Sequence, residues 1–211
     1  MTEELLFQIL FFIIFGLFAA IRIYYRSKVA WKESQSKTET ARKQGLGRAG
    51  VILSIGILGM FASLIVYFLL PLWSLWFHLP FPSLLRWVGV ILGISTLPLI
   101  IWIHRTLGRY YAAELRVIDK HVIITIGPYS RVRHPMYTVF ILISLSILLI
   151  IANLFVTIFA LLIIMMLYPI SKREEQMLIT QFGDQYRDYM QRTGRFLPPL
   201  RHHKQNENHV K

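Results

Sequence analysis

The chain of 211 residues contains no cysteine and few charged residues. Without cysteine it has no disulfide framework, no thiolate metal site, no cysteine nucleophile and no site for S-acylation. Only 16% of the residues are charged, whereas 55% are hydrophobic and the mean hydropathy is +0.52. Soluble globular domains carry about 25% charged residues. The composition therefore excludes an ordinary soluble domain and indicates an integral membrane protein.

Five segments are apolar over enough residues to cross a bilayer, whose hydrocarbon core of about 30 Å requires about 20 helical residues. The last two segments are the shortest and meet at Asn153 with almost no loop, which predicts a helical hairpin. We therefore expect an all-α integral membrane protein with about five transmembrane helices. The predicted spans are residues 5–25, 50–70, 84–103, 136–152 and 154–170.

Lysine and arginine are concentrated on one side of these predicted spans. If the N-terminus lies outside, the cytoplasmic segments 22–49, 104–135 and 171–211 hold 8, 6 and 8 basic residues, and only Arg86 lies outside. Basic residues favour the cytoplasmic flanks of membrane spans, so we expect an external N-terminus and a cytoplasmic C-terminus. The formal net charge of +12 then reflects topology and contact with anionic lipid, and no nucleic-acid partner is expected.

Three short motifs have structural explanations. Residues 45–50 form a G-x-G-x-x-G pattern, but a basic linker precedes it and a span follows, so we expect a flexible helix entry instead of a dinucleotide site. Gly89 and Gly93 form G-x-x-x-G, which predicts that another helix approaches closely. The tail at 200–211 contains histidines without carboxylates at ligand spacing, so we expect a disordered polar terminus and no metal site.

The loop before the fourth span has a polar mouth at the start of a helix. Its segment 117–126 has β-branched residues on both sides of a polar turn, which predicts a short hairpin. Arg133, His134 and Pro135 follow, and Pro135 can begin the helix because its missing N–H would have no helical partner there. The positive end of the helix dipole favours a carboxylate ligand. The alternative is that the basic residues only anchor the loop at the membrane interface.

Two adjacent glutamates lie where the last predicted span ends. Glu174 and Glu175 are acidic residues at a border that is otherwise basic, so they require partners. Salt bridges to Arg131 or Arg133 across the tight hairpin are the structural explanation, and capture of a cationic ligand is the functional one. The residues alone leave both explanations open.

Together these two segments resemble the isoprenylcysteine carboxyl methyltransferase and phospholipid methyltransferase family of integral membrane enzymes. The resemblance covers residues from about 104 to 199, and the first three spans resemble the family only in being apolar. The ordered elements are L-G-R at 107–109, H-x-x-x-T-x-G-P-Y at 121–129, R-H-P-x-Y at 133–137, E-E-x-x-L at 174–178, F-G-x-x-Y at 182–186 and L-P at 197–198.

The resemblance implies that S-adenosylmethionine binds in a cytoplasmic pocket formed by the loop before helix 4, the start of that helix and the C-terminal segment. It implies a catalytic region at 104–199 with the hairpin 136–170, preceded by three spans at 1–103 with a basic linker at 26–49. A lipid or prenylated acceptor would enter sideways from the bilayer. The implied cofactor contacts are Glu114, His121, Val122, Ile123, Ile124, Tyr129, His134, Pro135, Met136, Tyr137 and Glu174.

The sequence departs from the family pattern at two positions. Family members that act on prenylcysteine tend to carry an arginine one turn before the first glutamate, where this chain has Ile170. Lys172 or Arg173 is a candidate substitute, although the register and the geometry differ. The second departure is Glu114, at a position that matches a family glutamine.

The favoured function is S-adenosylmethionine-dependent carboxyl O-methylation of an isoprenylcysteine-type substrate, which requires no metal. A carboxylate acceptor needs a cation beside it, for which Arg133 and Arg173 are candidates, whereas an amine acceptor needs a base such as Glu175 or His134. The predicted catalytic residues are Arg133, Arg173 and Glu175. The alternatives are a phospholipid N-methyltransferase, an NADPH-dependent enzyme similar to sterol reductases, and a non-enzymatic membrane adaptor.

Overall fold

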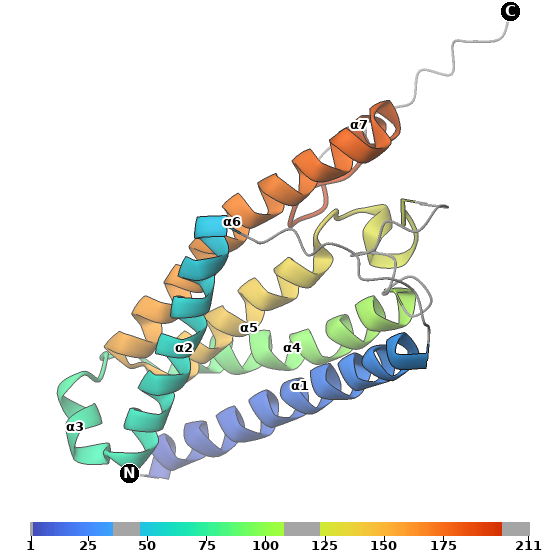
Figure 1. Ribbon diagram of the computed structural model, residues 1–211. Coiled ribbons are helices and arrows are strands. Elements are labelled where there is room, and N and C mark those ends of the chain that lie inside the picture. The colour runs from blue at the N-terminus through green and yellow to red at the C-terminus, as the bar shows by residue number, and fades with distance from the viewer. Residues whose placement is uncertain (1, 36–46, 108–122, 200–211) are drawn as a thin grey trace, which may run out of the picture.

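The computed structural model describes residues 2–35, 47–107 and 123–199 (Figure 1). Within these ranges the protein is helical, and its β-type pairing consists of two isolated bridges. The elements are α1 (Thr2–Gln35), α2 (Gly47–Leu69), α3 (Pro71–Trp76), α4 (Ser83–Leu107), the 3-10 helix η1 (Gly127–Ser130), α5 (Pro135–Ile151), α6 (Leu154–Phe182) and α7 (Asp184–Arg192).

The predicted all-α membrane fold is confirmed. Helices α1, α2, α4 and α6 are each long and apolar enough to cross a membrane, and α5 is a shorter apolar helix of 17 residues. Asn153 separates α5 from α6, and its side-chain oxygen accepts hydrogen bonds from the backbone N–H groups of Phe155 and Val156 at the start of α6. This N-cap explains why the chain reverses at Asn153 with almost no loop.

Several helices extend beyond the predicted spans. Helix α6 does not end at residue 170 but continues to Phe182, so Glu174 and Glu175 lie on the helix itself. Residues 172–178 are mostly lysine, arginine, glutamate, glutamine, methionine and leucine, all good helix formers, so the helix persists after the apolar run ends. The hydrophobic pattern predicted only the apolar part of the helix, and it did not predict the polar part after residue 170.

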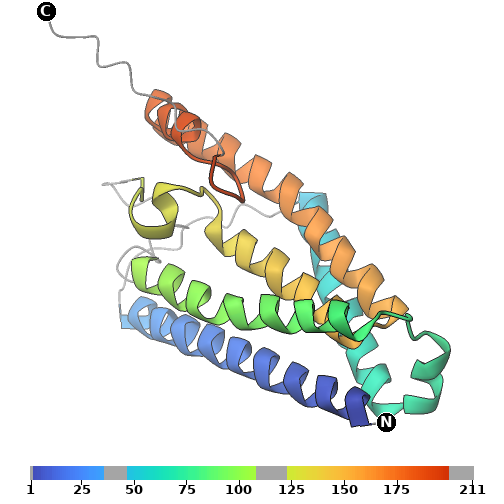
Figure 2. The same cartoon turned by 180° about the vertical axis from the view of Figure 1, so that it is seen from behind.

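Helices α1, α4 and α5 pack together, and the contact of α5 with α6 joins them to α2. Helix α4 contacts α1 and α5, whereas α2 packs against α6, and both views show α1 and α4 running side by side (Figures 1 and 2). A Cβ atom on Gly89 would lie 2.7 Å from the Leu149 Cβ, and one on Gly93 would lie 2.5 Å from the Ser146 Oγ. The predicted close approach at the G-x-x-x-G motif is therefore confirmed, between α4 and α5.

The end of the bundle that holds the N-terminus is closed by a buried arginine. Arg86 donates to Glu4 at 2.6 Å and to the Ile150 carbonyl at 2.9 and 2.6 Å, and its guanidinium lies 4.1 Å from the centre of the Phe7 ring. The arginine thus ties α1, α4 and α5 together. The start of α5, the end of α6 and α7 lie at the opposite end of the bundle (Figure 1).

The structure describes only part of the G-x-G-x-x-G pattern and of the predicted hairpin, and none of the tail. Gly47 begins α2 and Gly50 lies within its first turn, so this part of the G-x-G-x-x-G pattern is a helix start. Residues 45 and 46 lie outside the described residues, as do the tail 200–211 and residues 117–122 of the predicted hairpin.

Candidate active site

The start of α5 is held by a short backbone pairing with the C-terminal segment. The N–H groups of Arg133 and His134 donate to the carbonyls of Gly194 and Arg195 at 2.8 and 3.0 Å. In return, the Gly194 N–H donates to the Arg131 carbonyl at 3.0 Å. These bonds place residues 193–196, which follow α7, directly against the residues that lead into α5.

Gly194 fits this pairing because it has no side chain. A Cβ atom at this position would lie 1.8 Å from the carbonyl oxygen of Leu197, a backbone atom that cannot move aside like the end of a flexible side chain. The chain therefore folds back tightly after α7. The Thr138 hydroxyl donates to the Phe196 carbonyl at 2.6 Å and fixes the same segment to the first turn of α5.

Glu175 is buried at the centre of an ion-pair network beneath this pairing. Its side chain is only 3% exposed. Arg133 Nε donates to Oε1 at 2.8 Å, and Arg195 Nη2 donates to Oε2 at 2.5 Å. Arg133 also donates to the carbonyls of Met190 and Thr193. One carboxylate thus joins α6, the α5 entry and the C-terminal segment, and two guanidinium groups compensate its burial.

Glu174 has a different environment from its neighbour. The Tyr137 hydroxyl donates to its Oε1 at 2.5 Å, and His134 Nδ1 lies 3.5 Å from its Oε2. The His134 and Tyr137 rings are stacked with centroids 5.4 Å apart and planes inclined by 5°. Glu174 has no arginine among its described contacts and its side chain is 32% exposed, so the carboxylate is reachable beside the start of α5.

Tyr129 and Tyr189 connect η1 to α7 next to the same network. The buried Tyr189 hydroxyl donates to the Tyr129 carbonyl at 2.6 Å. Burial raises the pKa of Tyr189 to about 12, and burial together with the nearby Glu175 carboxylate raises the pKa of Tyr186. The Glu175 hydrogen bond raises the pKa of Arg195 further above its usual value. Both tyrosines are therefore neutral, and Arg195 is charged, at physiological pH.

Residues 87–180 match the model of the isoprenylcysteine carboxyl methyltransferase (ICMT) family. This region of the chain is similar to the ICMT family. The match covers a little under half of the 211 residues and includes α4 from Trp87 onward, η1, α5 and nearly all of α6. None of the curated proteins matches the chain. The family resemblance inferred from the sequence is confirmed by this match, and the matched model describes a methyltransferase family.

The structure brings several of the predicted ICMT site residues together. His134 lies between the two glutamates, with Nδ1 3.5 Å from Glu174 and Nε2 3.3 Å from Glu175, and Tyr137 bonds to Glu174. Arg133 pairs with Glu175, which selects Arg133 over Arg131 as the salt-bridge partner. The catalytic roles predicted for Arg133 and Glu175 stay predictions.

The other predicted site residues lie around this group or outside the described ranges. Pro135 is buried, Met136 is half-buried, and Tyr129 is buried in η1. Ile123 and Ile124 are half-buried and lead into η1, while Arg173 is exposed on α6. Glu114, His121 and Val122 lie outside the described residues.

Sequence reasoning gave no role to two residues that shape this candidate site. Arg195 completes the Glu175 network, and its guanidinium also lies 4.7 Å from the centre of the Tyr168 ring. Gly194 makes the backbone pairing possible. Both lie beyond residue 180, where the family match ends, and the available signal was an arginine directly before the closing Phe-Leu-Pro element.

Proposed function

We propose that the protein transfers a methyl group from S-adenosylmethionine to a lipid-like acceptor in the membrane. The favoured reaction is carboxyl O-methylation of an isoprenylcysteine-type substrate. The match of residues 87–180 to the ICMT family model supports methyl transfer. The observation that carries the cofactor assignment is the reachable Glu174 carboxylate, which lies beside the first turn of α5 and bonds only to Tyr137 and His134 among its described contacts.

The residues present fit the charges of this cofactor. Its ammonium group suits the Glu174 carboxylate, because a buried or half-buried cation requires a charged acceptor. Its carboxylate suits the start of α5, which Pro135 begins and which no side chain caps. When bound, S-adenosylmethionine supplies a sulfonium-activated methyl group, which an acceptor oxygen attacks while the C–S bond breaks and its electron pair stays on the departing thioether sulfur.

The chain's contribution to this reaction is alignment and exclusion of water. Tyr137 and His134 hold Glu174 in one orientation, and apolar residues such as Ile124 and Met136 are proposed to cover the cofactor's adenosine. Fixed alignment of reacting groups can contribute about 7–11 kcal/mol to a barrier reduction. A carboxylate acceptor needs no general base, because it is already ionised at neutral pH.

Arg133 and Glu175 are proposed to act on the reaction by positioning other groups. Glu175 pairs with both Arg133 and Arg195, and Arg133 also bonds to the Met190 carbonyl, so these side chains hold the C-terminal segment against α5. Arg173, exposed on α6, stays a proposed contact for an anionic acceptor. We further propose residues 104–199 as the catalytic region, facing the cytoplasm, because the basic residues gather at this end.

A cofactor titration and a methyl-transfer assay test the proposal. Purified, detergent-solubilised protein is titrated with S-adenosylhomocysteine and with NADPH by calorimetry, and should bind only the former. Radiolabelled methyl transfer is then measured with N-acetyl-S-farnesylcysteine and with phosphatidylethanolamine as acceptors. Label on the farnesylcysteine supports carboxyl methylation, and label on the phospholipid replaces it with N-methylation. Binding of NADPH alone, or of neither nucleoside, would overturn methyl transfer.

A further inference from the structure

Arg22 lies inside a helix long enough to span a membrane, and no carboxylate among the described residues pairs with its charge. It lies in α1 within the candidate span Glu3–Lys28 and is half-buried. Its Nη1 lies 3.5 Å from the Met136 sulfur, and its guanidinium lies 5.0 Å from the centre of the Phe140 ring. Among the described residues His104 is a further ionisable neighbour of Arg22, and it carries no negative charge. A thioether and an aromatic face neutralise no charge.

The direction of this side chain is inconsistent with simple anchoring at the membrane surface. Long basic side chains near helix ends usually extend toward the headgroups, as the exposed Arg26 one turn later is placed to do. Arg22 instead reaches inward to the first turns of α5. Ionisable residues within a membrane that face the bundle interior mark ligand sites by default.

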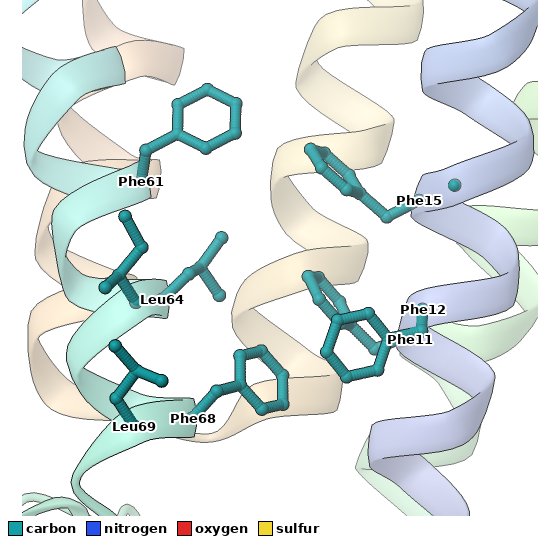
Figure 3. Close-up of a pocket in the computed structure, with 9 residues that line it drawn as sticks. Phe11, Phe12, Phe15, Phe61, Leu64, Phe68 and Leu69 are labelled. Carbon is teal, nitrogen blue, oxygen red and sulfur yellow. The ribbon is translucent and has the colours of Figure 1, made fainter.

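Arg22 follows, about two turns later along α1, the residues of that helix that line an apolar groove between α1 and α2. The groove has a volume of about 390 Å³, and phenylalanines from both helices face each other across it, with α5 behind (Figure 3). Phe15 precedes Arg22 by seven residues, so both lie on one face of α1, separated by about 10 Å along its axis. The lining residues are Phe11, Phe12, Phe15, Gly16, Phe61, Leu64, Ile65, Phe68 and Leu69.

We propose that Arg22 binds the carboxylate of the methyl acceptor while the acceptor's apolar chain lies in the α1–α2 groove. This inference rests on the proposed function and names its specificity residue. A negative head group joined to a long apolar chain matches an inward cation that lies about two helical turns from an apolar groove. Met136 is both a predicted cofactor contact and the residue that Arg22 touches, so the acceptor carboxylate would be held next to the cofactor.

This assignment also accounts for the position where the chain departs from the family pattern. Ile170 occupies the place of the arginine expected near the substrate carboxylate, and it is 2% exposed in the core. Arg22 supplies a cation to the site from a different helix, outside the region that matches the family model. Methylation removes the negative charge of the acceptor, so the same arginine would hold the acid and release the ester.

The test compares binding of N-acetyl-S-farnesylcysteine with binding of its methyl ester, in detergent and with S-adenosylhomocysteine present. The wild-type protein should bind the acid at least about tenfold more tightly, because a charge-assisted hydrogen bond is lost in the ester. Arg22→Met should bring this ratio close to one, and Arg22→Lys should retain part of it. Arg26→Met, one helical turn away and exposed, should keep the wild-type ratio.

A second variant tests the groove. Gly16 lines the groove, and a Cβ atom there has no neighbour within 4 Å, so Gly16→Phe should occupy the groove and weaken binding of the farnesyl acid at least about tenfold. Leu17→Phe, on the exposed face of the same helix, is the matched control.

The outcomes separate this inference from the proposed function. An unchanged acid-to-ester ratio in Arg22→Met, with normal cofactor binding, overturns the role of Arg22 alone. A tenfold loss of S-adenosylhomocysteine affinity in Arg22→Met assigns the arginine to the cofactor carboxylate and also overturns it. Equal effects of Gly16→Phe and Leu17→Phe overturn the groove. A wild-type protein that binds no S-adenosylhomocysteine contradicts the proposed function itself.

Discussion

Replacing Glu175 by glutamine should release the C-terminal segment from the start of α5. The carboxylate is 3% exposed and accepts hydrogen bonds from Arg133 at 2.8 Å and from Arg195 at 2.5 and 3.2 Å. Glu175→Gln removes the anion and leaves two guanidinium groups facing each other, 10% and 21% exposed. Breaking a buried pair in this way costs about 3–5 kcal/mol. We take the lower end, because Arg195 is partly hydrated.

A local loss of about 3 kcal/mol should raise the open population of this segment about 100-fold. Hydrogen exchange in detergent should therefore accelerate in peptides that contain residues 131–134 and 193–196. It should accelerate much less in the N-terminal half of α4, at the opposite end of the bundle. Asp184→Asn removes the Asp184–Arg187 pair, whose side chains are 88% and 61% exposed, and should change exchange in neither peptide. Unchanged exchange in Glu175→Gln would refute the conclusion that this network holds the segment.

Three further substitutions test other parts of the site. Gly194→Ala should destabilise the protein by more than about 1 kcal/mol and lower S-adenosylhomocysteine affinity, because its Cβ meets the Leu197 carbonyl; thermal unfolding and calorimetry measure both. Tyr137→Phe should weaken S-adenosylhomocysteine binding about 5- to 10-fold, because Glu174 loses its 2.5 Å hydrogen bond, and unchanged affinity would contradict this. Tyr189 should lower stability as pH rises from about 10 to about 12, because its phenol ionises more readily in the unfolded chain; Tyr189→Phe should reduce that loss in thermal unfolding followed against pH.

The sequence predicted the helical architecture because its signal is strong and local. Apolar runs set the positions of α1, α2, α4, α5 and α6, and Asn153 marked the reversal between the last two. The runs did not predict the polar extension of α6, because hydropathy reports only where a helix is apolar. The length of a helix past the membrane depends on propensity and on packing against other segments.

The sequence predicted which residues form the candidate site, but it did not predict which of them form ion pairs with one another. The spacing of the motifs identified Glu174, Glu175, Arg133 and His134 as candidate site residues. It did not decide whether either glutamate forms a salt bridge or binds a ligand. The structure distinguishes the two glutamates, because Glu175 is buried in an ion-pair network while Glu174 is partly exposed. This difference depends on Arg195, which reaches Glu175 because the chain turns back after α7. A contact of this kind produces no periodic pattern in the sequence and so could not be predicted from it.

The most direct test of the central claim is the affinity of a Glu174→Gln variant for S-adenosylhomocysteine. Glutamine keeps the size and the hydrogen-bonding ability of the side chain and removes the charge that we assign to the cofactor's ammonium group. Calorimetry on wild type, Glu174→Gln and Asp184→Asn should give equal affinities for the first and third proteins and at least tenfold weaker binding for the second. Equal affinity in all three would contradict the placement of the cofactor at Glu174.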